Sequence, residues 1–152
     1  MAETKKKSTS GFTPEERAAM RALTAERRAS QKQADLDEAQ AAAIAKLPPA
    51  ERKMAKQIDA IVRKHAPVLA AKTFYGMPGW ARDAKVCVFF QAASKFTVRY
   101  NTIGFQPEAN LDQGDMWPTG FALRKIGPAE EKKIAALVKK AVSGTVSRDG
   151  GR

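Results

Sequence analysis

The chain has 152 residues, of which 43% are hydrophobic and 28% are charged, and this composition fits one globular domain with an extension. No apolar run approaches the roughly 20 residues that cross a bilayer, and residues 1–10 lack the apolar core of a secretory signal. One cysteine and one histidine exclude a disulfide framework and Cys/His zinc sites. We therefore expect a cytoplasmic protein without a membrane span.

The net charge of +11 is concentrated in residues 50–142, which carry 16 basic and 8 acidic side chains. The excess therefore belongs to the part of the chain that is expected to fold, rather than to a tail. A basic domain attracts polyanions such as nucleic acid, although a positive surplus can also serve solubility alone.

Residues 1–11 are predicted to be a disordered basic lead, and residues 12–49 a helical extension. Thr13 is placed as the N-cap, Pro14 as the first helical residue, and Glu16 as the partner that completes a capping box. The segment that follows is rich in Ala, Glu, Arg, Lys and Gln and poor in apolar residues. Such a helix is either solvated or anchored to the domain at a few points.

The domain proper is expected to span residues 50–142. An apolar stripe at helical spacing predicts a helix over residues 50–64. Residues 73–80 then hold three aromatics, two glycines and a proline, which favours a shaped apolar corner over a solvated loop. The sequence leaves open whether the Met77–Pro78 or the Trp117–Pro118 peptide bond is cis.

Strands are expected after this corner. Residues 85–91 are apolar on both faces, which predicts a central strand that is covered on both sides. Residues 95–100 alternate apolar and polar side chains and predict a second strand. Residues 101–118 are expected to be irregular, and residues 119–126 form the third strand candidate.

A last helix follows Gly127 and Pro128, and residues 143–152 are expected to be a flexible tail. The predicted class is α+β, with an antiparallel sheet, helices packed on one of its faces and a helical N-terminal extension.

Three sets of residues are candidate sites, each with a structural alternative. The carboxylates Glu108, Asp112 and Asp115 could bind a metal such as iron(II), or serve turns and caps. The basic residues Lys95, Arg99 and Arg124 could hold a nucleic-acid backbone beside aromatics on an open sheet, unless the N-terminal helix covers that face. The third set could line a small-ligand pocket, or be core: Tyr75, Met77, Trp80 and Trp117.

Catalysis is not expected. His65 lies on the apolar stripe at a helix end, and Cys87 lies in a buried strand, so no nucleophile–base pair can be assembled.

Several motifs resemble the YdhG-like domain family, a widespread bacterial domain of unknown function. The likeness covers roughly residues 50–142, and residues 12–20 also resemble a lead found in some members. It is carried by Tyr75-Gly76-Met77-Pro78, residues 85–91, residues 95–100, Gly104-Phe105, residues 109–114 and Met116-Trp117-Pro118-Thr119.

The resemblance implies a helix–sheet–helix layout like that of frataxin and a non-enzymatic binding protein. For some members it implies an intracellular iron chaperone, which here would bind iron through Glu108, Asp112 and Asp115 and pass it to a receiving protein. The alternatives are a basic nucleic-acid-associated protein and a small-ligand binder.

Overall fold

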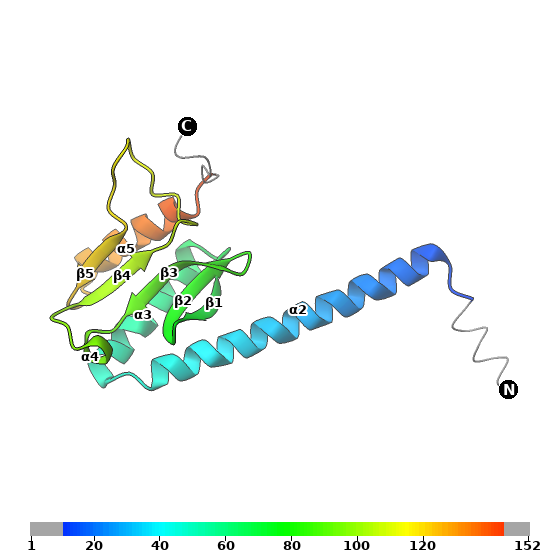
Figure 1. The fold of residues 1–152 in the computed structure, drawn as a ribbon, viewed down its shortest axis with the longest axis horizontal. Coiled ribbons are helices and arrows are strands. Elements are labelled where there is room, and N and C mark those ends of the chain that lie inside the picture. Colours follow the sequence, from blue (N-terminus) through cyan, green and yellow to red (C-terminus); the bar gives the residue numbers. More distant parts are fainter. Residues whose placement is uncertain (1–10, 145–152) are drawn as a thin grey trace. The chain divides into compact units, whose positions relative to one another are not determined.

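The computed structural model describes residues 11–144 of the chain (Figure 1). The chain forms two compact units, Met1–Asp35 and Leu36–Arg152, and we call the second the sheet domain. Most of the expected disordered lead (residues 1–10) and of the expected tail (residues 145–152) lies outside the described residues. Within residues 11–144, none of the helices has both the length and the apolar character that a membrane span requires.

Helix α2 (Pro14–Ala45) begins with the predicted capping box. The Glu16 amide donates to Thr13 Oγ1 at 3.0 Å, and the Thr13 amide donates to Glu16 Oε1 at 2.8 Å. Gln40 and Ile44 are the buried residues of this helix, and both belong to the sheet domain. The sheet domain thus begins inside α2, at Leu36, whereas the sequence placed its boundary after residue 49.

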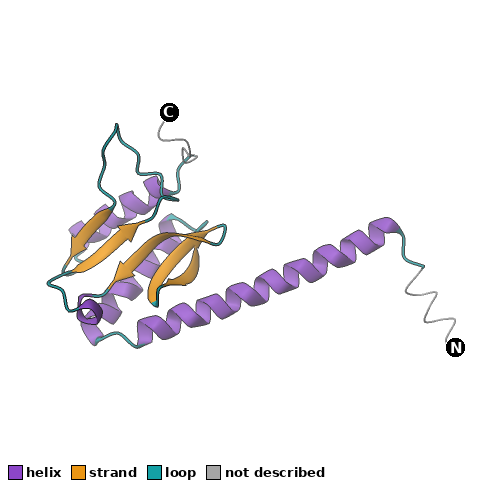
Figure 2. Cartoon of the chain, viewed as in Figure 1, coloured by secondary structure: helices purple, strands orange, loops and turns teal. Residues whose placement is uncertain are grey.

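Five strands form one antiparallel sheet in the order β1-β2-β3-β4-β5. Helices α3 (Pro49–His65) and α5 (Pro128–Ala141) pack on one face, and no helix among the described residues of the sheet domain covers the other (Figure 2). The predicted α+β class is therefore confirmed. The strands are β1 (Ala70–Phe74), β2 (Met77–Arg82), β3 (Lys85–Gln91), β4 (Asn101–Phe105) and β5 (Gly120–Leu123).

The core lies between the sheet and the helices. The predicted stripe of α3 is buried there, with Ile58 and Val62 at 0% exposure, and it meets Val138 of α5. Trp80 of β2 fills the centre and donates its indole N–H to Asp59 Oδ1 of α3 at 2.9 Å. The same carboxylate accepts a hydrogen bond from Arg63 Nε at 2.8 Å through its other oxygen.

The expected corner is the tip of the β1–β2 hairpin. Tyr75 and Gly76 form its two-residue turn, both with positive φ (50° and 79°), as the right-handed twist of a tight hairpin demands. Phe74 pairs with Met77 across the turn. The Met77–Pro78 and Trp117–Pro118 peptide bonds are both trans.

The prediction of a strand over residues 95–100 is wrong. The chain forms a short helix there, α4 (Ala93–Phe96), and Thr97 ends it in a left-handed conformation (φ 52°). Asn101 stabilises the start of α4 because its side-chain oxygen accepts the Ala93 amide at 2.8 Å. The apolar residues of this segment are exposed, and the real strand, β4, lies in the stretch expected to be irregular.

Strand β3 has the predicted bounds, but the expectation that both of its faces are covered is only partly met. Val88 and Phe90 point into the core, whereas the intervening Phe89 lies on the open face and is half-buried. The pairing with β2 shifts register between Trp80 and Ala81, and at this bulge Cys87 and Val88 are both buried.

Cys87 is expected to be unreactive in the folded protein. Burial and, second, the negative charge of Glu108 raise its pKa to about 11, so the thiol stays protonated well above neutral pH. We expect a disulfide reagent at mildly alkaline pH to label the urea-unfolded chain rapidly and the native protein very slowly. Rapid native labelling would contradict this burial.

The same shift links Cys87 to stability. The folded-state pKa lies above the ordinary value of 9.0, so the protonated thiol stabilises the fold fully below that pH. This contribution is lost as the pH rises from 9.0 toward about 11. A Cys87→Ala variant should show a shallower loss of stability over that range in urea unfolding.

Candidate ligand-binding site

The connections between the strands differ in charge at the two ends of the sheet. The hairpin turn, α4 with its flanking residues and the end of β5 all lie at one end of the sheet. These segments (residues 75–76, 92–100 and 124–125) carry four basic and no acidic side chains, and we call this the basic end. The opposite end (residues 83–84 and 106–119) carries four acidic and no basic side chains, and we call it the acidic end.

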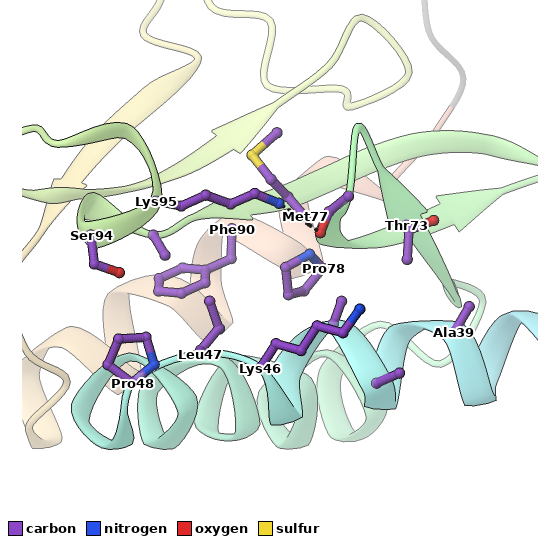
Figure 3. A pocket seen from close by; sticks show the side chains of 14 residues that line it. Ala39, Lys46, Leu47, Pro48, Thr73, Met77, Pro78, Phe90, Ser94 and Lys95 are labelled. Atoms are coloured by element: carbon purple, nitrogen blue, oxygen red, sulfur yellow. Dashed lines mark hydrogen bonds between the residues drawn. The ribbon is translucent and has the colours of Figure 1, made fainter.

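A cavity of about 640 Å³ opens at the basic end. It lies between the last turns of α2, the β1–β2 hairpin, the end of β3 and α4 (Figure 3). Leu47, Pro78 and Phe90 form its apolar interior, and small alanines of α2 leave the space open. Because Lys46, Ser94 and Lys95 are exposed, the cavity is open to solvent on that side.

The polar groups of the cavity are positive or neutral. Fourteen residues line it, and none of them is acidic. Lys46 and Lys95 approach it from opposite sides, one from the turn after α2 and the other from α4 (Figure 3). Lys95 Nζ donates to the Gly76 carbonyl at 3.2 Å, which holds this ammonium group at the rim.

The N-terminal end of α3 also borders the cavity. Pro48, the N-cap of that helix, lines the cavity, and its side chain makes no capping hydrogen bond. A helix N-terminus carries a partial positive charge, but Glu51 in the first turn of α3, which accepts a hydrogen bond from the Ser94 amide at 3.0 Å, offsets it, so the positive rim depends on the two lysines. The cavity thus combines an apolar interior with a positive rim, which is the arrangement that binds an amphipathic anion.

The four residues predicted to share an aromatic pocket do not come together. Met77 lines the cavity, but Trp80 is 1% exposed and belongs to the core. Tyr75 is 86% exposed at the hairpin tip, and Trp117 packs partly buried against the core from the acidic end. Tyr75 and Trp117 therefore lie at opposite ends of the sheet.

The predicted metal ligands all lie at the acidic end but do not form a ligand set. Among residues 11–144, no group of three His, Cys, Asp or Glu side chains is arranged to hold a metal ion. Glu108 lies 4.0 Å from Lys85 Nζ instead. Ala109 and Leu111 are buried, so they anchor the loop in the core. The three carboxylates are close in sequence, but the fold does not bring them together around one point.

The predicted nucleic-acid residues Lys95, Arg99 and Arg124 all lie at the basic end, although not on a strand as expected. Arg99 places its guanidinium 5.1 Å from the centre of the Tyr100 ring. Sequence reasoning missed Lys46 and the end of α2, because it assigned them to the extension. The alanine run 41–43 beside the apolar Ile44 was the available signal.

Comparisons of the chain with protein-family models, with curated proteins and with solved structures found no match. The resemblance to the YdhG-like family therefore stays a prediction, and the site itself is the basis for a function.

Proposed function

We propose that the chain is a non-enzymatic binding protein whose cavity at the basic end holds a small amphipathic anion, such as a medium-chain carboxylate. The single observation that supports this is the lining: an apolar interior between two lysines, with no acidic side chain. The volume of about 640 Å³ is in the range of small-molecule sites.

In this proposal the two parts of the ligand contact different parts of the cavity. The alkyl chain lies along Leu47, Pro78 and Phe90 and loses its contact with water. The anionic head lies between Lys46 and Lys95, where each ammonium group can donate a charge-assisted hydrogen bond. Neither His65 nor Cys87 lines the cavity, so the proposal includes no catalytic step.

The iron role implied by the resemblance receives no support from Glu108, Asp112 and Asp115, because these carboxylates form no ligand group.

Calorimetric titration with decanoate tests the proposal, with decylammonium as the probe of equal length and opposite charge. We expect saturable binding of decanoate and much weaker binding of decylammonium, because the rim is positive. The double variant K46M/K95M should bind decanoate at least about tenfold more weakly, which corresponds to about 1.4 kcal/mol.

The matched control is Lys64→Met, which removes an exposed lysine that is not in the lining and should leave the affinity unchanged. Ala43→Leu fills the cavity and should also weaken binding. Equal affinity for both probes would contradict an anion site. If neither probe binds, the cavity is not a site for ligands of this kind.

A further inference from the structure

The open face of the sheet carries a cluster of aromatic rings. Phe74 and Phe89 lie with ring centres 5.0 Å apart, and Phe74 meets Tyr75 edge to face at 4.7 Å. We call Phe74, Tyr75 and Phe89 the aromatic surface. None of the three belongs to the core between the sheet and the helices.

Two glycines in the neighbouring strands flank Phe89. Phe89 pairs with Gly79 on one side and with Gly104 on the other. A Cβ at Gly104 would lie 2.2 Å from Phe89 Cζ, so the glycine leaves room for the end of the ring. The ring therefore lies across β4 instead of standing away from the sheet.

The backbone conformation at Tyr75 is unfavourable for a tyrosine. Two-residue hairpin turns with positive φ at both positions prefer Asn or Asp before Gly, and a bulky residue there is strained. The tyrosine is 86% exposed, so little burial offsets this cost. Strained residues with exposed aromatic rings are found at binding surfaces, and this points to a partner that covers the ring.

Basic and polar side chains flank the aromatic surface. Lys72 pairs opposite Gly79 and so lies on the open face, where its Nζ donates to the Ala84 carbonyl at 2.6 Å. Lys95 Nζ lies beside Gly76 at the other end, and the paired Gln91 and Thr102 share the face of Phe89.

We propose that this open face binds single-stranded RNA. Unpaired bases stack on the aromatic surface, because every base offers a flat ring face. Lys72 and Lys95 attract the phosphates, while Gln91 and Thr102 offer hydrogen bonds to base edges and 2′-hydroxyl groups. The inference is independent of the cavity and shares only Lys95 with it.

Fluorescence anisotropy with a labelled oligouridine of about 12 nucleotides tests this proposal at low salt. We expect saturable binding whose affinity falls steeply as salt is raised. An oligothymidine DNA and an RNA duplex of the same length should bind more weakly. Equal or tighter binding of either would overturn the proposal, as would no binding of the oligouridine.

The decisive variant is Tyr75→Asn, because Asn suits the turn and lacks the ring. We expect its affinity for oligouridine to fall about tenfold, while its melting temperature stays the same or rises. Lys72→Met should weaken binding and reduce the salt dependence.

The matched control is Met116→Asn, which removes a side chain that is 91% exposed but lies at the acidic end, and its affinity should not change. Unchanged affinity in both Tyr75→Asn and Lys72→Met would also overturn the proposal. Neither residue belongs to the charged or apolar groups assigned to decanoate, so their effects separate this surface from the cavity.

Discussion

Replacing Asp59 by alanine should lower the free energy of unfolding by about 2 kcal/mol, because the indole N–H of the buried Trp80 loses its acceptor. The Trp80 indole N–H donates to Asp59 Oδ1 at 2.9 Å, and Trp80 is only 1% exposed. The Asp59 side chain is 23% exposed, so water can reach the vacated position and recover part of the loss. Urea unfolding followed by tryptophan fluorescence measures the change.

The control separates this hydrogen bond from the ion pair of the same carboxylate. Arg63 donates to Asp59 Oδ2, but its side chain is 61% exposed. Exposed pairs contribute at most about 1 kcal/mol, so Arg63→Met should have a much smaller effect. Asp59→Asn keeps an acceptor for Trp80 and should lie between the two. Equal losses in Asp59→Ala and Arg63→Met would show that the indole bond does not matter.

Replacing Gly104 by alanine should cost about 2 kcal/mol, through overpacking against Phe89. The added Cβ would lie 2.2 Å from Phe89 Cζ and 2.5 Å from Cε1, closer than any real contact. Gly104 is paired on both sides, with Phe89 and with Gly120, so its backbone cannot move away. The ring must leave its place on β4.

A matched glycine on the next strand is the control. A Cβ at Gly120 would have Thr102 Cγ2 as its nearest neighbour, at 3.9 Å, so Gly120→Ala should be close to neutral. In a double-mutant cycle, Phe89→Leu should relieve the clash and give a favourable coupling of about 1 kcal/mol with Gly104→Ala. Additive losses would mean that Phe89 is not the obstacle.

Periodicity identified the elements whose pattern reflects burial. The α3 stripe, the bounds of β3 and the capping box of α2 are all present in the structure. The alternation of apolar and polar side chains in residues 95–100 led to the wrong prediction of a strand, because α4 is stabilised by hydrogen bonds to residues outside this pattern. Asn101 accepts the Ala93 amide, and Glu51 of α3 accepts the Ser94 amide and hydroxyl. No local pattern reports such bonds.

The candidate site was less predictable than the fold. Its two lysines, Lys46 and Lys95, are far apart in sequence and meet only because α2 is anchored to the sheet. That anchor is buried Gln40, whose side-chain amide donates to the Gly79 carbonyl at 2.5 Å. A lone glutamine in a polar helix gives no sign of this contact, so the α2 side of the site, including Lys46, fell outside the predicted domain.

The separation of charge along the sheet also affects how the domain meets its partners. The connections of the strands are basic at one end and acidic at the other, but α5 places Glu130 and Glu131 near the basic end and Lys139 and Lys140 near the acidic end. The separation therefore acts at short range, within about a Debye length of the surface, rather than on a distant partner. A polyanion that reaches the domain is attracted to the hairpin tip and α4 and repelled by the loop at the other end, and raising the salt concentration weakens this preference.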